Sequence, residues 1–154
     1  MFITGANLTA VTTTQEFALG SLCMAQNGKI YKYMQYLEGA AATDGVAGEV
    51  AYYYAPSGAS EGSYTTCTSD LSDSAGVGAG VLQANMSNQE YGWFQIKGAA
   101  TLSIALTDGA DGDSLTPTGA GDGTLDLAVA AETDHICAQA LDASVPIIMC
   151  DFPF

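Results

Sequence analysis

Short runs of β-branched and aromatic residues recur along the whole chain, separated by Gly, Asn, Asp and Pro. This pattern is typical of an all-β fold, because the runs favour strands and the residues between them favour turns. A chain of 154 residues suits one domain with its own hydrophobic core. We therefore expect a small antiparallel β-barrel or sandwich over residues 18–154. Residues 1–17, which are rich in Thr and show little periodicity, are expected to form an extended N-terminal arm.

The dipeptide Asn27-Gly28 marks the clearest hairpin. It separates two strand-like runs and favours a two-residue type I′ turn, because both central positions of that turn need positive φ. In the second run, alternate residues point to opposite faces. Neither face is polar throughout: one carries Ile30, Lys32, Met34 and Tyr36, and the other carries Tyr31, Tyr33 and Gln35.

Two further aromatic strands are predicted, at residues 48–56 and 91–98. The first contains three consecutive tyrosines, so both of its faces carry aromatic bulk and one face is expected to meet another subunit or sheet. The second, "YGWFQIKG", alternates its side chains between two faces, and a separate strand after Gly98 would complete a meander. We expect subunit-interface contacts from Tyr52, Tyr53, Tyr54, Trp93 and Phe94.

Two segments are rich in turn-forming residues. Residues 57–80 contain many Gly, Ser, Thr and Asp residues, and we expect a long excursion or edge there, with one strand near residues 64–69. Residues 107–129 offer turn chemistry at almost every step. The expected core contacts of this second segment are Leu115, Leu125, Leu127 and Val129, with a short strand near residues 126–132.

The four cysteines fit no zinc-binding spacing. Folding residues 135–141 back about a turn at residues 142–145 would place Cys137 opposite Cys150. Two interpretations remain open for this pair: packed apolar thiols, or a cross-strand disulfide formed after release from the cell. The start of the chain shows no signal peptide and no apolar run long enough for a transmembrane helix, so we expect reduced thiols and synthesis in a cytosol.

Acidic residues outnumber cationic ones by 17 to 3, which gives a formal net charge of −14. Nucleic acid and anionic membrane surfaces are therefore poor partners, because both bind through Lys and Arg. Only 13% of the residues are charged while 48% are hydrophobic. Much of the surface must then be weakly polar, as protein interfaces often are.

Searches for catalytic and metal-binding patterns give weak signals. The segment "GASEG" (58–62) matches a nucleophile elbow centred on Ser60, but no helix is expected after it, as that motif requires. Asp108, Asp111 and Asp113 form either ordinary turns or a weak ion site. His135 is expected to be structural. We predict no catalytic residue, no metal and no cofactor.

Exposed aromatic residues of a β-sandwich can also stack on sugars. Trp93 and the tyrosine cluster would serve a carbohydrate- or receptor-binding module in this way. A single tryptophan in an alternating strand is alternatively a core or subunit contact.

The order of motifs resembles the decoration, or cement, proteins that coat the capsids of tailed phages. The resemblance rests on "EFALGS" (16–21), "NGKIYKYMQ" (27–35), "GVAGEVAYY" (45–53), "YGWFQIKG" (91–98), "GDSLTPTG" (112–119) and the closing residues 136–154. It implies a compact all-β domain with an arm, commonly trimeric, on the outer capsid surface of the virion. It also implies that the protein holds the major capsid protein subunits together and catalyses no reaction.

These expectations assign roles to two groups of residues. The arm would engage the shell through Phe2, Ile3, Leu8, Val11 and Thr13, since an extended segment can add a strand to a neighbour's sheet. The aromatic strands would build a homotrimer. The alternative functions are a virion-surface carbohydrate- or receptor-binding module, and a hydrolase centred on Ser60.

Overall fold

The computed structural model describes residues 2–40, 42–55, 64–129 and 134–154. These residues form a single sheet of 11 strands and one short 3₁₀-helix at Leu71–Asp73, so the predicted all-β class is confirmed. In this part of the chain no helix is long and apolar enough to cross a membrane. The strands are β1 (Phe2–Ile3), β2 (Leu22–Met24), β3 (Ile30–Tyr36), β4 (Val50–Tyr54), β5 (Thr66–Thr68), β6 (Ser74–Leu82), β7 (Tyr91–Thr101), β8 (Ser114–Thr116), β9 (Asp126–Leu127), β10 (Ala138–Asp142) and β11 (Ile147–Asp151).

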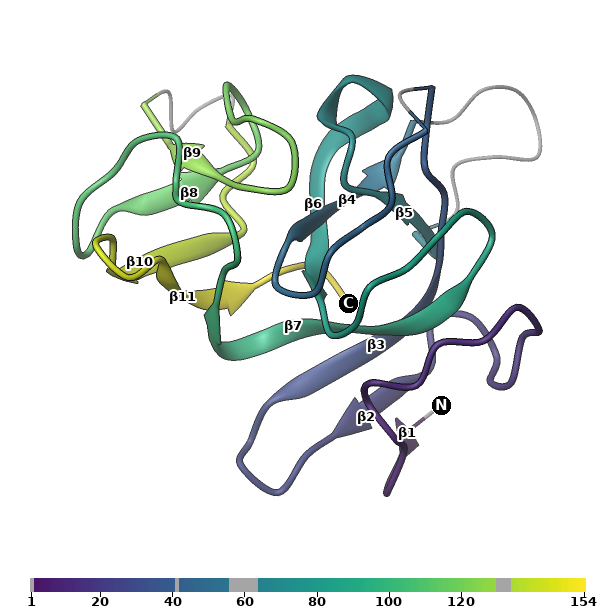
Figure 1. Cartoon of the computed structure of the whole chain (residues 1–154). Helices are drawn as coiled ribbons and strands as arrows, with labels where there is room; N and C mark the ends of the chain where they lie inside the picture. The colour runs from purple at the N-terminus through teal and green to yellow at the C-terminus, as the bar shows by residue number, and fades with distance from the viewer. Residues whose placement is uncertain (1, 41, 56–63, 130–133) are drawn as a thin grey trace.

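The strands follow the order β1-β2-β3-β5-β4-β6-β7-β11-β10-β8-β9. Because β7 also pairs with β3, the strands β3, β5, β4, β6 and β7 are hydrogen-bonded in a ring. The sheet as a whole is not a closed barrel, since β1 and β9 leave two open ends. From β7 onward, β11, β10, β8 and β9 form a C-terminal sheet beside the ring (Figure 1). Strand β7 therefore belongs to both parts of the molecule.

Three groups of buried side chains make up the core. The ring core lies among the ring strands and contains Met34, Tyr36, Ala51, Tyr53, Cys67, Ala79, Leu82, Met86 and Phe94. The junction core connects the ring with the C-terminal sheet and includes Val50, Tyr52, Ile96, Leu115, Leu125, Ile148 and Phe152. The N-terminal core consists of Cys23, Tyr31, Tyr33 and Trp93. The two faces of β3 were predicted correctly, because Met34 and Tyr36 enter the ring core while Tyr31 and Tyr33 enter the N-terminal core.

The hairpin at Asn27-Gly28 is confirmed, but its turn differs from the prediction. The amide of Gly28 donates to the carbonyl oxygen of Ala25 at 3.0 Å, and the amide of Ala25 donates to that of Lys29 at 2.9 Å. Gly28 has φ of 80°, whereas Asn27 is not among the residues with positive φ. This is a three-residue loop, in which a left-handed glycine follows the turn.

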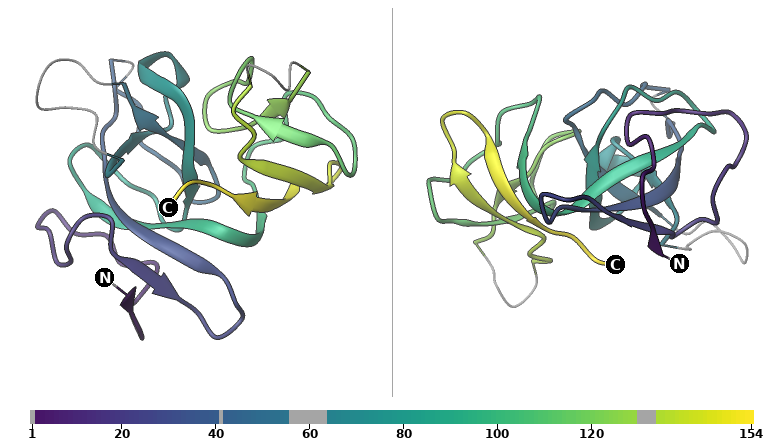
Figure 2. Two further views of the ribbon diagram at one scale, coloured as in Figure 1. Left: turned by 180° about the vertical axis from the view of Figure 1, so that it is seen from behind. Right: turned by 90° about the horizontal axis from the view of Figure 1, so that it is seen from below.

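The predicted extended arm is folded onto its own domain. β1 pairs in parallel with β2, and Thr12 bridges to Tyr91 through two backbone hydrogen bonds of 2.9 and 3.1 Å. Ile3, Leu8 and Phe17 pack against the N-terminal core. Figure 2 shows the segment lying along β2, β3 and β7 rather than projecting from the body. The segment holds this folded position because its apolar side chains cover Trp93 and the tyrosines of the N-terminal core.

The predicted excursion at residues 57–80 is wrong for its second half. Residues 57–63 lie outside the described part of the chain, and the strand expected near residues 64–69 is present as β5. Residues 74–80, however, belong to β6, a nine-residue strand between β4 and β7. Glycine suits this strand because side chains from other segments leave no room for a Cβ atom at Gly78. A Cβ atom on Gly78 would lie 2.7 Å from Cε1 of Phe152 and 2.9 Å from Sγ of Cys137.

The expected meander after Gly98 is absent, because β7 continues through this glycine to Thr101. Gly98 has φ of 92° and marks an irregularity within the strand rather than a turn. The buried side chain of Gln95 stabilises it, since Nε2 donates to the carbonyl oxygens of Lys97, Gly98 and Ala99 at 3.3, 3.0 and 3.0 Å. β11 then pairs with this last part of β7.

The C-terminal residues agree only in part with the predictions. Leu115 and Leu125 are buried in the junction core, Leu127 is half-buried, and Val129 is 83% exposed and so is not a core contact. Cys150 pairs with Ala138, one residue beyond the predicted partner Cys137. Both cysteines are free, buried thiols in the structure, as the packed-thiol interpretation describes.

Candidate functional site

Most of the aromatic residues predicted at the subunit interface lie inside the chain. Tyr52 and Phe94 are 0% exposed, Trp93 is 2% exposed and Tyr53 is 3% exposed, while Tyr54 is half-buried. Their strands were predicted correctly, but the side chains fill the core of a single chain. Burial removes these four side chains from any subunit contact, and it leaves Trp93 with no face on which a sugar could stack.

The five arm residues divide into two groups. Ile3 and Leu8 pack against the N-terminal core, and Val11 packs against the ring core, so these three side chains are half-buried within their own chain. Phe2 is 66% exposed and Thr13 is also exposed. The register between β1 and β2 places Phe2 opposite Leu22, on the same face as Met24, which is 52% exposed.

The residues considered for catalysis or ion binding do not assemble into one site. Ser60 lies outside the described residues. His135 is half-buried, and its Nδ1 has no hydrogen-bond partner among the described residues. In the described ranges no group of three or more His, Cys, Asp or Glu side chains is arranged to hold a metal ion.

The three aspartates of the 108–113 segment serve its turns. Each carboxylate accepts a backbone amide: Asp108 from Gly109, Asp113 from Ala110, and Asp111 from Ala143, each at 2.8 Å. Asp111 thereby connects this segment to the turn between β10 and β11. These contacts agree with the turn interpretation made from the sequence.

Lys32 is the most unusual ionisable group of the structure. It is 3% exposed and points into the ring, where Nζ donates to Oη of Tyr53 at 2.9 Å and lies 5.0 Å from the centre of that ring. No carboxylate pairs with it in the described part of the chain. Burial lowers the pKa of Lys32 to about 8, and the nearby Cys67 opposes this shift. The alternation of β3 placed Lys32 beside Met34 and Tyr36, but we did not expect it to be buried.

The surroundings of Lys32 do not form a reactive centre. Burial raises the pKa of the Cys67 thiol and of the Tyr53 hydroxyl well above their ordinary values, so both stay protonated at neutral pH. Burial also raises the pKa of the Cys150 thiol, to about 12. Thiolates, which are the nucleophilic form of cysteine, are therefore disfavoured at these positions. The ring interior is a packed core with one buried cation.

A second feature is the solvent-facing side of the C-terminal sheet, which we call the outer face. The cross-strand register places its members on one side of four strands: Lys97, Ala99 and Thr101 of β7, Ile147, Met149 and Asp151 of β11, Gln139 and Leu141 of β10, and Ser114 of β8. Met149 is 41% and Leu141 42% exposed. The opposite side of the same strands packs into the junction core through small residues such as Ala100, Ala138 and Ala140.

The outer face is nearly neutral and is not flat. Two of its charged groups, Lys97 and Asp151, form an ion pair with each other, and Asp142 lies opposite Ile147 at its margin. The ring of Phe154 lies over Nζ of Lys97, with the ring centre 4.8 Å away. A hollow of about 300 Å³ lies beside Met149 and is lined by Ile136, Gln139 and Ser114 among others. Figure 2, right, looks onto β7, β10 and β11 from this side.

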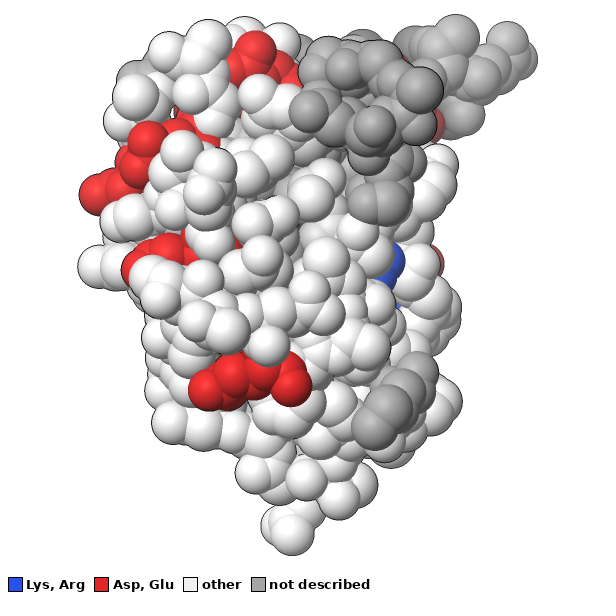
Figure 3. All heavy atoms as spheres, turned by 90° about the vertical axis from the view of Figure 1, so that its right-hand side faces the viewer, with Lys and Arg blue, Asp and Glu red and all other residues white. Residues whose placement is uncertain are grey.

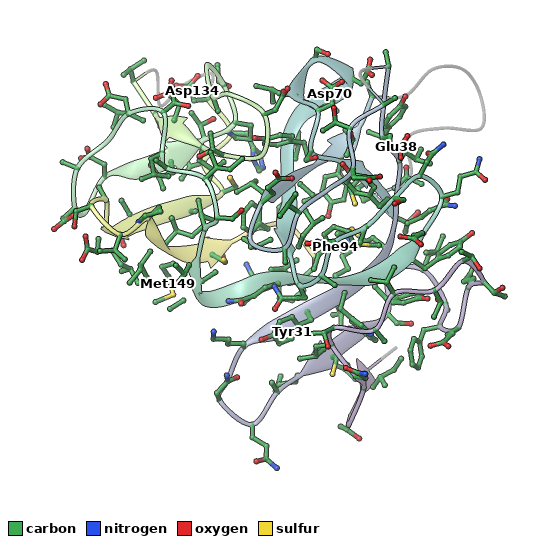
Figure 4. All side chains as sticks on the ribbon, viewed as in Figure 1. Tyr31, Glu38, Asp70, Phe94, Asp134 and Met149 are labelled. Atoms are coloured by element: carbon green, nitrogen blue, oxygen red, sulfur yellow. The ribbon has the colours of Figure 1, made fainter. Side chains whose placement is uncertain are left out.

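Charge is distributed unevenly over the molecule. Residues 1–37 contain a single acidic residue, Glu16, and two of the three lysines. The third, Lys97, pairs across the sheet with Ile30 at the hairpin. In Figure 4, Glu38, Asp70 and Asp134 lie at the upper end of the molecule, and Tyr31 and Met149 lie on the lower side. The lowest part of the view in Figure 3, where the β2–β3 hairpin ends, shows no red atoms.

Comparisons of the chain with protein-family models, with curated proteins and with solved structures found no match.

Proposed function

We propose that the chain is a structural protein of a tailed-phage virion, which binds the outer surface of the capsid and stabilises contacts between major capsid protein subunits without catalysing a reaction. The observation that carries this proposal is the uneven charge. A weakly charged lower side with exposed apolar residues suits protein contact, and an acidic opposite side suits solvent. The resemblance to cement proteins described above points to the same class of function.

The side chains best suited to meet the shell are those we call the hairpin surface: Phe2, Thr4, Met24, Gln26 and Asn27, all exposed. They come from β1 and the residue that follows it, from β2 and from the β2–β3 turn, and none is charged. Phe2 and Met24 provide the apolar area. A small contact of this kind is weak alone, but many copies on one particle, each bridging neighbouring subunits, would stabilise the shell together.

The test is binding to capsids of the source phage that lack the protein. We expect Phe2→Asp and Met24→Asp each to weaken binding by about tenfold or more, because each places a carboxylate in an apolar contact. The matched control is Val129→Asp, which adds the same charge at a site that is 83% exposed and away from the hairpin. Full binding by both variants, or no binding by the unaltered protein, would contradict the proposal.

Folding of the variants can be verified independently of binding. Trp93 packs under the N-terminal segment, against Phe17 at 5.4 Å and Tyr33 at 5.2 Å between ring centres. Its fluorescence therefore reports whether that segment remains docked. A variant with unchanged fluorescence and weakened capsid binding has lost a surface contact and not its fold.

A further inference from the structure

We infer that the outer face of the C-terminal sheet is where a second copy of this chain packs, face to face. The inference rests on the charge, shape and extent of the face and does not depend on the proposed function. Its members come from β7, β8, β10 and β11, and Ser114, Gln139 and Met149 among them are exposed. Exposed Met149 lies in the row formed by Ala99, Met149, Gln139 and Ser114.

Electrostatics favours a copy of the chain as the occupant. Two molecules that each carry a formal charge of −14 repel each other over most of their surfaces. On the outer face Asp151 is neutralised by Lys97, and Asp142, opposite Ile147 at the margin, accepts hydrogen bonds from the amides of Ser144 and Val145, so like-charged copies can approach there at low cost. A basic partner would gain nothing from this neutral face, because the unpaired carboxylates it would seek lie elsewhere.

The shape of the face also complements itself. Met149 stands on the face, and the hollow of about 300 Å³ lies beside it, so each copy offers both a side chain to insert and a place to receive one. The ion pair likewise presents both signs of charge. A surface that carries complementary features in one patch is suited to a two-fold contact, in which the same patch is used by both partners.

The extent of the face predicts a weak pair. Three strands with about five residues each and a fourth, β8, with three span at most roughly 15 Å by 17 Å. This area is well below the roughly 800 Å² per partner of a standard interface. Exposed Val145 and Phe154, near its margins, add to this area. We therefore expect pairing that depends on concentration. It differs from the trimer implied by the resemblance, where each copy would use two different surfaces.

The first test is sedimentation velocity of the whole chain over a wide concentration range. We expect a monomer–dimer equilibrium, and we expect Met149→Lys to raise its dissociation constant by about tenfold or more, because two added cations would face each other. Thr13→Lys adds the same charge at an exposed position in the N-terminal segment, away from the C-terminal sheet, and should leave the equilibrium unchanged. A monomer at every concentration, or an oligomer unaffected by Met149→Lys, would overturn the inference.

The second test uses cross-linking, which captures a weak pair. In Met149→Cys the new thiol lies near the middle of the face, while the four native cysteines are buried. Air oxidation should convert this variant into a covalent dimer faster than Thr13→Cys, whose thiol would lie in the exposed N-terminal segment, at the same concentration. Equal rates for the two variants would overturn a face-to-face pair, as would a covalent dimer that forms only after denaturation.

Discussion

Two segments of similar glycine content, residues 74–82 and 107–124, adopt opposite structures. The first is β6, a central strand of the ring, and the second is largely turns around the short strand β8. Their neighbours explain the difference. In β6 the glycines alternate with Ala and Val, and at Gly78 the missing side chain makes room for Phe152. In 107–124 three of the five glycines follow Asp, and aspartate carboxylates of this segment bind turn amides. Glycine content therefore predicts little until the residues beside each glycine are considered.

The largest test of this comparison is Gly78→Ala. The added methyl would meet Phe152 and Cys137 at under 3 Å, so we expect it to lower the free energy of unfolding by about 2–3 kcal/mol. Gly121→Ala is the control, because its Cβ would have one neighbour, Cγ2 of Thr124 at 3.9 Å. That change should stay within about 0.5 kcal/mol. Equal effects in urea unfolding would mean that glycine has the same role in both segments.

The second test concerns the ring that β6 helps to form. If the ring excludes water, burying the protonated Lys32 costs folding free energy. Lys32→Met should therefore raise the free energy of unfolding by about 2 kcal/mol at pH 7. Because burial lowers the pKa of Lys32 from 10.5 to about 8 in the folded chain, the protonated form is disfavoured there. The cost is complete below pH 8 and disappears as pH rises to 10.5.

The pH dependence should be measured as a difference between the unaltered protein and Lys32→Met. Buried thiols titrate over the same range with the opposite sign, since their raised pKa makes the folded state less stable as pH increases above the ordinary value. Subtraction removes most of their contribution. If the difference in free energy of unfolding between the two proteins stayed constant from pH 7 to pH 10.5, water would have to reach Lys32.

The smallest test lies in the other segment. Asp113→Ala removes the 2.8 Å hydrogen bond from the amide of Ala110, and we expect a loss of about 0.5–1 kcal/mol. Ser103→Ala, at an exposed position outside the segment, is a suitable control. If Asp113→Ala had no effect on thermal unfolding, the aspartates would not be what distinguishes this segment from β6.

The sequence was informative wherever a pattern was local. Alternation in β3 predicted which side chains face which core, and Asn27-Gly28 predicted the hairpin. It was misleading where tertiary contacts decide. Nothing near Gly78 in the sequence indicates Phe152, which approaches it from the end of the chain, and nothing near Thr12 indicates Tyr91. The candidate surfaces depend on such contacts. The N-terminal segment buries Trp93, and this long-range contact removes Trp93 from the aromatic residues that remain exposed.

Strand β7 pairs with β3, β6 and β11, so a single stretch of backbone connects the ring to the C-terminal sheet. Tension applied to β11 along the strand direction would load its hydrogen bonds with Lys97 to Thr101 together, in shear, rather than opening them one after another. The load would then pass through β7 directly into β3. A molecule built in this way resists stretching most strongly along one axis, and that axis is the line of β7.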